Sequence, residues 1–179
     1  MKTVVGLDLS LTSTGWAYDN NQGIISVKSK ETERLADIVN QFTKLLHEIK
    51  NPVVVLEGYS FASRSGQAFS IGELGGVIRL CLHNLKIPFA VVPPTCRAKF
   101  ATGRGNASKN EVVSSISAKT GIVWAGKGSD DMCDAWILQE MGLYVLGKSR
   151  YQWGKENIDS LQKIDWSTIG GTIEQKPTN

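Results

Sequence analysis

Acidic residues end two of the most apolar runs of this chain, at positions where a protein core is expected. Asp8 ends the run in VVGLDLS, and Glu57 ends the run in VVVLEGY. A carboxylate that is buried without a partner is so costly that it must take up a proton, find a partner or bind a cation. Any fold of this chain must therefore provide for these charges.

The segment SDDMCDAWIL adds two more acids to the pattern. Asp131 and Asp134 are three residues apart, so their carboxylates can lie on one face of a helix. Mg²⁺ prefers oxygen ligands, and two such ions roughly 3.5–4 Å apart can hold the attacking and leaving oxygens of a phosphate displacement. Three acidic segments far apart in the sequence therefore predict one shared metal site. The other interpretation is that Asp130 and Asp131 only interact with a helix dipole.

The order and spacing of the apolar residues predict an α/β fold with one mixed sheet flanked by helices. Three antiparallel strands come first, and two short, continuously apolar strands follow, which is typical of parallel strands covered on both faces. The strands are expected at residues 3–9, 15–18, 24–28, 53–56 and 89–92. The helices are expected at residues 31–50, 68–85, 95–101, 108–120 and 130–146. Asp8 and Glu57 then end strands that can be neighbours in the sheet.

Residues 1–146 hold all these elements and are expected to form one domain, for which an apolar content of 41% supplies a core. Residues 147–179 are polar, with Trp153 and Trp166 as the only large anchors, so a loosely docked or partly disordered tail is expected. No apolar run approaches the roughly 20 residues that cross a bilayer, and the N-terminus does not resemble a signal peptide. We therefore expect a cytoplasmic protein without membrane contact.

Positive charge is concentrated in one stretch of the chain. Between residues 97 and 127, six lysines and arginines stand against Glu111 alone, which gives this stretch a charge of +5 and the rest of the chain −2. Such asymmetry favours a polyanionic partner. A solvated basic surface is the other interpretation.

Taken together, these segments resemble the RuvC-type Holliday-junction resolvases of the RNase H-like superfamily, including the smaller virus-encoded members. GLDLSLTSTGWA resembles the family's opening strand and turn, VVVLEGYSF its glutamate-bearing strand, GELGGVIR the helix that follows, PPTCRAKFATGRGNASKNEVV its basic connector, and SDDMCDAWIL its closing helix. The similarity covers Met1 to about Leu146. It implies an RNase H-like fold with a five-stranded mixed sheet, three antiparallel strands followed by two parallel ones, between helices.

The resemblance also implies an activity and a site. Asp8, Glu57, Asp131 and Asp134 would form a catalytic tetrad that binds two Mg²⁺ ions, with Mn²⁺ as a substitute. Some relatives have a histidine where Asp131 stands, and Asp130 is a competing ligand. The implied enzyme is a metal-dependent, structure-selective endodeoxyribonuclease of DNA recombination and repair. It would resolve four-way Holliday junctions by paired nicks that leave 5′-phosphate and 3′-hydroxyl ends.

Two other functions are compatible with the same residues. A broader flap or branched-DNA endonuclease would use the same acids, and a non-catalytic junction-binding module would need only the basic connector. If the chain is virus-encoded, the expected location is the host cytoplasm.

DNA contacts are predicted in two segments, by the same likeness. Two lysines match basic positions that approach the scissile phosphate or the backbone, and an arginine lies in the glycine-flanked loop between them. Aromatic residues after Glu57 are candidates for stacking on bases at a branch point, although packing against the domain is the other interpretation. The six predicted contacts are Lys99, Arg104, Lys109, Tyr59, Phe61 and Arg64. Arg97 and Lys127 are predicted to be plain surface residues.

The helix expected over residues 68–85 contains Gly72, Gly75 and Gly76, although a glycine inside a helix costs about 1 kcal/mol relative to alanine. Close approach of another element is the expected compensation. Relatives dimerise through the equivalent helix, so the resemblance implies a homodimer whose two sites match the two-fold symmetry of a four-way junction. Packing within one chain is the alternative explanation of the glycines.

Overall fold

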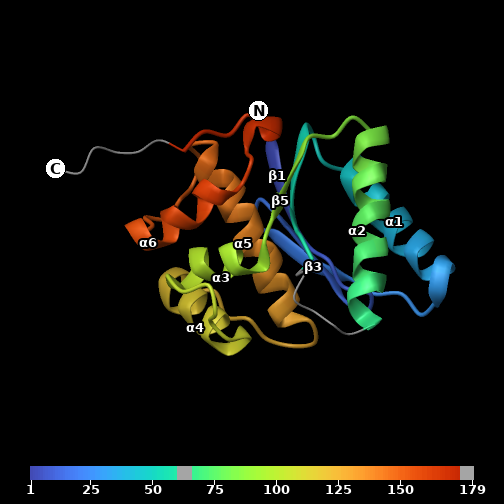
Figure 1. Cartoon of the computed structure of the whole chain (residues 1–179), viewed down its shortest axis with the longest axis horizontal. Helices are drawn as coiled ribbons and strands as arrows, with labels where there is room; N and C mark the ends of the chain where they lie inside the picture. The colour runs from blue at the N-terminus through green and yellow to red at the C-terminus, as the bar shows by residue number, and fades with distance from the viewer. Residues whose placement is uncertain (60–65, 174–179) are drawn as a thin grey trace.

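The computed structural model of the protein describes residues 1–59 and 66–173, apart from the side chains of residues 66–68. One sheet lies between two layers of helices (Figure 1). The strands are β1 (Thr3–Asp8), β2 (Thr14–Tyr18), β3 (Asn21–Ile25), β4 (Pro52–Glu57) and β5 (Phe89–Val92). The helices are α1 (Glu31–His47), α2 (Gly66–Asn84), α3 (Pro94–Thr102), α4 (Lys109–Thr120), α5 (Ser129–Val145) and α6 (Lys155–Ile158), followed by the 3₁₀ turns η1 (Asp159–Lys163) and η2 (Ser167–Ile169).

The sheet has the order β3-β2-β1-β4-β5. Strands β1, β2 and β3 pair antiparallel, whereas β1, β4 and β5 pair parallel. This arrangement confirms the predicted five-stranded mixed sheet. The predicted bounds of the third strand were wrong. Strand β3 spans Asn21–Ile25 and not residues 24–28, because Tyr18 already pairs with Asn21 and the left-handed Asp19 (φ 49°) closes a tighter turn than expected.

Each face of the sheet has its own apolar core, because successive residues of a strand point to opposite faces. Val4 and Val55 pack on the side of α5, whereas Val5 and Val54 pack on the side of α1 and α2. In Figure 1, α1 and α2 cover one face, and α3, α4, α5 and α6 lie on the other. Burial on both faces accounts for the continuous apolar sequence of β4.

Helix α5 lies directly against the backbone of β1 and β2, and glycines make this approach possible. A β-carbon on Gly6 would lie 1.9 Å from the carbonyl oxygen of Ala135, and one on Gly15 would lie 2.1 Å from the carbonyl oxygen of Asp131. Neither distance is possible for real atoms, so only glycine fits at either position. The two contacts fix where the first turns of α5 stand relative to the end of β1.

The described part of the C-terminal segment, residues 147–173, is packed more firmly than its polar composition predicted. Trp153, Leu161, Trp166 and Ile169 are buried in the core on the α5 side. The Trp153 and Phe100 ring centroids are 4.2 Å apart. The expectation of a loosely docked tail is therefore wrong for these residues, because Leu161 and Ile164, which stand between the two tryptophans, add apolar anchors. A domain boundary at residue 146 stays a prediction, and residues 174–179 lie outside the described part.

None of the helices in the described ranges is long and apolar enough to cross a membrane.

Candidate active site

The ends of the parallel strands and the start of α5 meet at one edge of the sheet. Asp8 is the last residue of β1 and Glu57 is the last residue of β4, which runs parallel beside it. Asp8 pairs with Gly15 across β1 and β2, and the main chain of Asp131 lies against Gly15. Asp134 follows one helical turn later. The fold thus brings together the four predicted acids, called the acid cluster below: Asp8, Glu57, Asp131 and Asp134.

Burial raises the pKa values of two members of the acid cluster. Burial, followed by the charges of Glu57 and Asp134, raises the pKa of the Asp8 carboxyl well above its ordinary value. Burial raises the pKa of Asp134 to about 7, against the lowering effect of Arg97. Burial disfavours the ionised form of these two carboxyls. A cation bound beside them would stabilise the ionised form.

The structure distinguishes between the two neighbouring acids at the start of α5. The Asp130 side chain is 43% exposed and accepts a hydrogen bond of 2.7 Å from Lys109 Nζ, which lowers the pKa of Asp130. The Asp131 side chain is 15% exposed, and its Oδ1 lies 3.7 Å from Lys109 Nζ. This difference in exposure favours Asp131 over Asp130 as the fourth member of the acid cluster.

Arg97 is a site residue that the sequence interpretation missed. It was predicted to lie on the surface, but it is only 8% exposed. Its Nε donates a hydrogen bond of 2.5 Å to Glu57 Oε1, and its Nη1 donates one to Asp134 Oδ1. Burial works to lower the pKa of Arg97, but the charges of Glu57 and Asp134 more than offset it, so the pKa is raised.

The burial of Arg97 follows from the order of the strands in the sheet. Helix α3 starts two residues after β5, and β5 ends at the same edge of the sheet as Asp8 and Glu57. A charged side chain in the first turn of α3, flanked by Cys96 and Ala98, is therefore carried toward the acids.

The residues of the acid cluster fit a hard divalent cation by their chemistry, since carboxylate oxygens are the ligands that Mg²⁺ and Mn²⁺ accept. In the described ranges, no group of three or more acidic, histidine or cysteine side chains is gathered closely enough to hold a metal ion as it stands. Arg97 gives a reason, because its guanidinium bridges Glu57 and Asp134. The carboxylates that could bind a metal ion are therefore present, but Arg97 already binds two of them.

The predicted DNA contacts have different surroundings. Lys109 is exposed and lies beside the acid cluster, whereas Lys99 is half-buried in the last turn of α3. Arg104 is exposed, and its Nη2 pairs with Glu111 Oε1 at 2.5 Å. Glu111 also closes a capping box with Ser108 at the start of α4, so this one acid orders the loop before Lys109.

The aromatic segment is described only in part. Tyr59 is exposed, and the guanidinium of Arg79 lies 5.8 Å from the centre of its ring. Phe61 and Arg64 lie outside the described residues, so their predicted contacts with DNA remain predictions.

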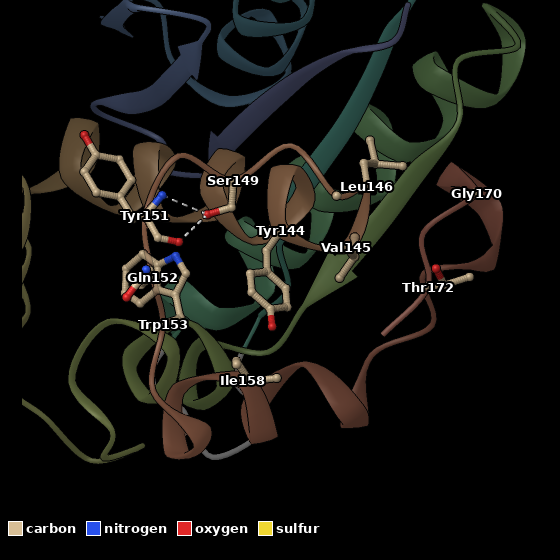
Figure 2. A pocket seen from close by; sticks show the side chains of 11 residues that line it. Tyr144, Val145, Leu146, Ser149, Tyr151, Gln152, Trp153, Ile158, Gly170 and Thr172 are labelled. Carbon is tan, nitrogen blue, oxygen red and sulfur yellow. Dashed lines mark hydrogen bonds between the residues drawn. The ribbon is translucent and has the colours of Figure 1, made fainter. Parts of the chain in front are cut away.

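A separate cavity of about 810 Å³ lies between the end of α5 and the C-terminal segment (Figure 2). Tyr144, Ser149 and Trp153 line it, and Ser149 Oγ accepts a hydrogen bond from the amide of Tyr151 and donates one to its carbonyl. Its lining includes none of the acid cluster and no charged side chain. It is therefore poorly suited to bind phosphate, and the candidate site stays at the edge of the sheet.

Comparison with known proteins gives consistent matches. The family model described as crossover junction endodeoxyribonuclease RuvC matches residues 4–135. A RuvC of Prochlorococcus marinus (strain NATL2A) is 28% identical over 153 residues, which cover 79% of this chain and 98% of that relative. A RuvC of Treponema denticola is 26% identical over 130 residues, covering 66% of this chain and 73% of the relative.

Solved structures agree with the fold. RuvC of Thermus thermophilus, in a structure described as a complex with Holliday junction substrate, superimposes with a TM-score of 0.66 at 20% identity. The match covers 84% of this chain and 99% of that one. A second Thermus thermophilus RuvC structure has a TM-score of 0.64. At this level of identity, the likeness establishes a common fold.

Proposed function

Because this chain belongs to the RuvC family of crossover junction endodeoxyribonucleases, we propose that it resolves four-way DNA junctions by paired, metal-dependent nicks. The observation that carries the proposal is the convergence of Asp8, Glu57, Asp131 and Asp134 at one edge of the sheet. These residues come from three elements that are far apart in the sequence. A structural role alone gives no reason to gather four acids in one place and to bury two of them.

The acid cluster is proposed to bind two Mg²⁺ ions, with Mn²⁺ as a substitute. When bound, such ions supply an activated water and stabilise the charge that develops on the phosphate. Asp8 and Glu57 hold their carboxylates on rigid strand ends, whereas Asp131 and Asp134 hold theirs on α5. Lys109, beside Asp130 and Asp131, is positioned to approach a backbone phosphate. The products would carry 5′-phosphate and 3′-hydroxyl ends.

The proposed substrate is branched DNA, recognised by its shape and its phosphates. Lys99, Arg104 and Lys109 belong to the stretch that carries a charge of +5, and such contacts fix position on DNA without reading bases. Tyr59, Phe61 and Arg64 are proposed to contact the branch point. A role in DNA recombination and repair, in the cytoplasm or in the host cytoplasm if the chain is virus-encoded, belongs to the same proposal.

Helix α2 is proposed to form a homodimer interface. Phe69, Gly72, Gly76 and Leu80 follow each other at helical spacing and so lie on one face. Phe69 is 80% exposed and Leu80 is 59% exposed, and a β-carbon on Gly72 or Gly76 would meet no atom of the chain within 4 Å. Packing within the chain accounts for Gly75, which faces Leu9 and Tyr59. It does not account for the other two glycines, so a second copy of the chain is the proposed occupant.

Replacing Leu80 with glutamate is expected to convert the dimer into a monomer, because it places a charge on an apolar contact surface. Sedimentation or light scattering would measure the change in mass. The exposed Val123 lies in the loop before α5, away from α2, so Val123→Glu should leave the mass unchanged. A wild-type chain that is monomeric at micromolar concentration both alone and on a junction would contradict the dimer.

The proposed function is tested with an immobile four-way junction whose strands are labelled in turn. We expect symmetric nicks in opposite strands with Mg²⁺ or Mn²⁺, ligatable products, and no cleavage in EDTA. Cleavage of flaps and forks at equal or higher rates would instead identify a broader branched-DNA endonuclease. Tight junction binding without cleavage in either metal would identify a non-catalytic junction-binding module.

A further inference from the structure

Arg97 reaches the acid cluster from α3, whereas the acids themselves lie on β1, β4 and α5. It lies in the first turn of α3, directly after β5, and its amide donates to the carbonyl of Pro93 at 3.1 Å. Its neighbours Cys96 and Ala98 are buried. The backbone of Arg97 is thus held by the fold, and its long side chain reaches toward the ends of β1 and β4.

The guanidinium of Arg97 uses two different nitrogens to bind two acids from different elements. Nε donates to Glu57 at the end of β4, and Nη1 donates to Asp134 on α5. A planar guanidinium presents several donors in fixed directions, which a lysine ammonium cannot do. An arginine side chain stays positively charged in proteins, so Arg97 brings a permanent charge to these two acids.

Arg97 binds carboxylate oxygens that a metal ion at the acid cluster would also need as ligands. A divalent ion binds carboxylate oxygens at about 2.0–2.6 Å, and an oxygen that accepts a short hydrogen bond from Arg97 is less available to it. Arg97 and Lys109 are two cationic side chains beside five acidic ones, the four of the acid cluster and Asp130, so further positive charge remains favourable.

We propose that Arg97 is a resident counter-ion of the acid cluster, which stabilises the metal-free protein and must be displaced from Glu57 and Asp134 when divalent ions bind. This proposal rests on the proposed function, because it takes the acid cluster to be the metal site. Arg97 thereby keeps the acids folded together before metal arrives. It also makes metal binding weaker than four carboxylates alone would allow.

The test measures metal affinity and metal-free stability on the same variants. In Arg97→Gln, we expect Mn²⁺ to bind at least about tenfold more tightly, as judged by calorimetry or by the electron paramagnetic resonance signal of free Mn²⁺. In EDTA, the same variant should melt about 5 °C lower or more, because the buried Asp134 and the partly buried Glu57 lose their counter-charge. A residue with a purely structural role would lower the stability without tightening Mn²⁺ binding.

Two further variants keep the test decisive. Arg97→Lys retains the charge but cannot bridge both acids, so its Mn²⁺ affinity should lie between those of wild type and Arg97→Gln. Arg34→Gln removes a positive charge from α1, where Arg34 Nε donates to the carbonyl of Ser29. This control should change neither the affinity for Mn²⁺ nor the melting temperature in EDTA. If Arg97→Gln folds only when Mn²⁺ is added, that result supports the proposal, and Arg97→Lys supplies the affinity comparison.

Failure of this inference is distinguishable from failure of the proposed function. If wild type binds Mn²⁺, Asp8→Asn weakens that binding, and both Arg97 variants bind Mn²⁺ no more tightly than wild type, then the counter-ion proposal is overturned and the metal site stands. If wild type and Asp8→Asn both fail to bind Mn²⁺ with or without a DNA junction, then the metal site itself is overturned.

Discussion

Cleavage of a four-way junction is expected to fall on the order of 10³-fold when Asp8 is replaced by asparagine. Asparagine has nearly the same shape as aspartate but lacks the charge that Asp8, the proposed metal ligand at the end of β1, would supply. The junction should still bind, because the basic stretch is untouched. Single-turnover cleavage and gel-shift binding on the same labelled junction would measure both effects.

The same substitution is expected to leave the metal-free protein as stable as wild type or more stable at pH 8. The pKa of Asp8 is raised in the folded protein, so the folded state holds a proton that the unfolded state loses. Stability is therefore lost as the pH rises above the ordinary pKa of an aspartate toward the raised value. Urea unfolding in EDTA at pH 5 and pH 8 should show a smaller pH dependence for Asp8→Asn than for wild type.

A matched control is available at Asp37, a carboxylate on α1 that accepts a hydrogen bond from Ser29 Oγ at 2.6 Å. Asp37→Asn should cleave at the wild-type rate. If Asp8→Asn also cleaved at that rate in Mg²⁺, the assignment of Asp8 as a metal ligand would be wrong.

The second large effect is expected from Gly15→Ala. The added methyl group would lie 2.1 Å from the carbonyl oxygen of Asp131, so either β2 or the first turn of α5 must move. Overpacking of this kind costs about 1–3 kcal/mol of unfolding free energy. Because the displaced backbone carries Asp131, junction cleavage should fall as well. Urea unfolding and single-turnover cleavage would measure the two losses.

A suitable comparison is Gly72→Ala, whose added methyl group would meet no atom of the chain within 4 Å. Both changes are best made in the Leu80→Glu chain, so that association through α2 does not contribute to stability. In that background Gly72→Ala should be neutral or stabilising by up to about 1 kcal/mol, since alanine favours a helix. Equal stability of Gly15→Ala and its parent would contradict the close contact between β2 and α5.

The sheet and the acids could be predicted because each leaves a local trace in the sequence. Continuous apolar runs gave β4 and β5, and Asp8 and Glu57 stood out because they end such runs. Asp134 stood out because an apolar helix surrounds it. In each case the unusual feature is a polar residue in an apolar setting, which a reader of the sequence can see without knowing the fold.

Other features depend on contacts between distant residues and leave no such trace. Arg97 looks like one of several basic residues until the end of β5 is placed beside β4, and only then does its burial follow. The C-terminal segment looks polar because Leu161, Ile164 and Ile169 are separated by polar residues, yet their apolar side chains share one core. Gly15 gave no sign of its contact with α5, because the contact involves the backbone of Asp131.

The contact of β1 with α5 also bears on how the protein is made. Gly6 and Ala135 touch although most of the chain lies between them, so the central strand cannot be fully covered until α5 has been synthesised. Contacts of such high sequence separation slow folding, because a long loop must close before they form. We expect a nascent chain that ends before α5 to remain without a working nuclease centre. Synthesis itself would then delay DNA cutting until the domain is essentially complete.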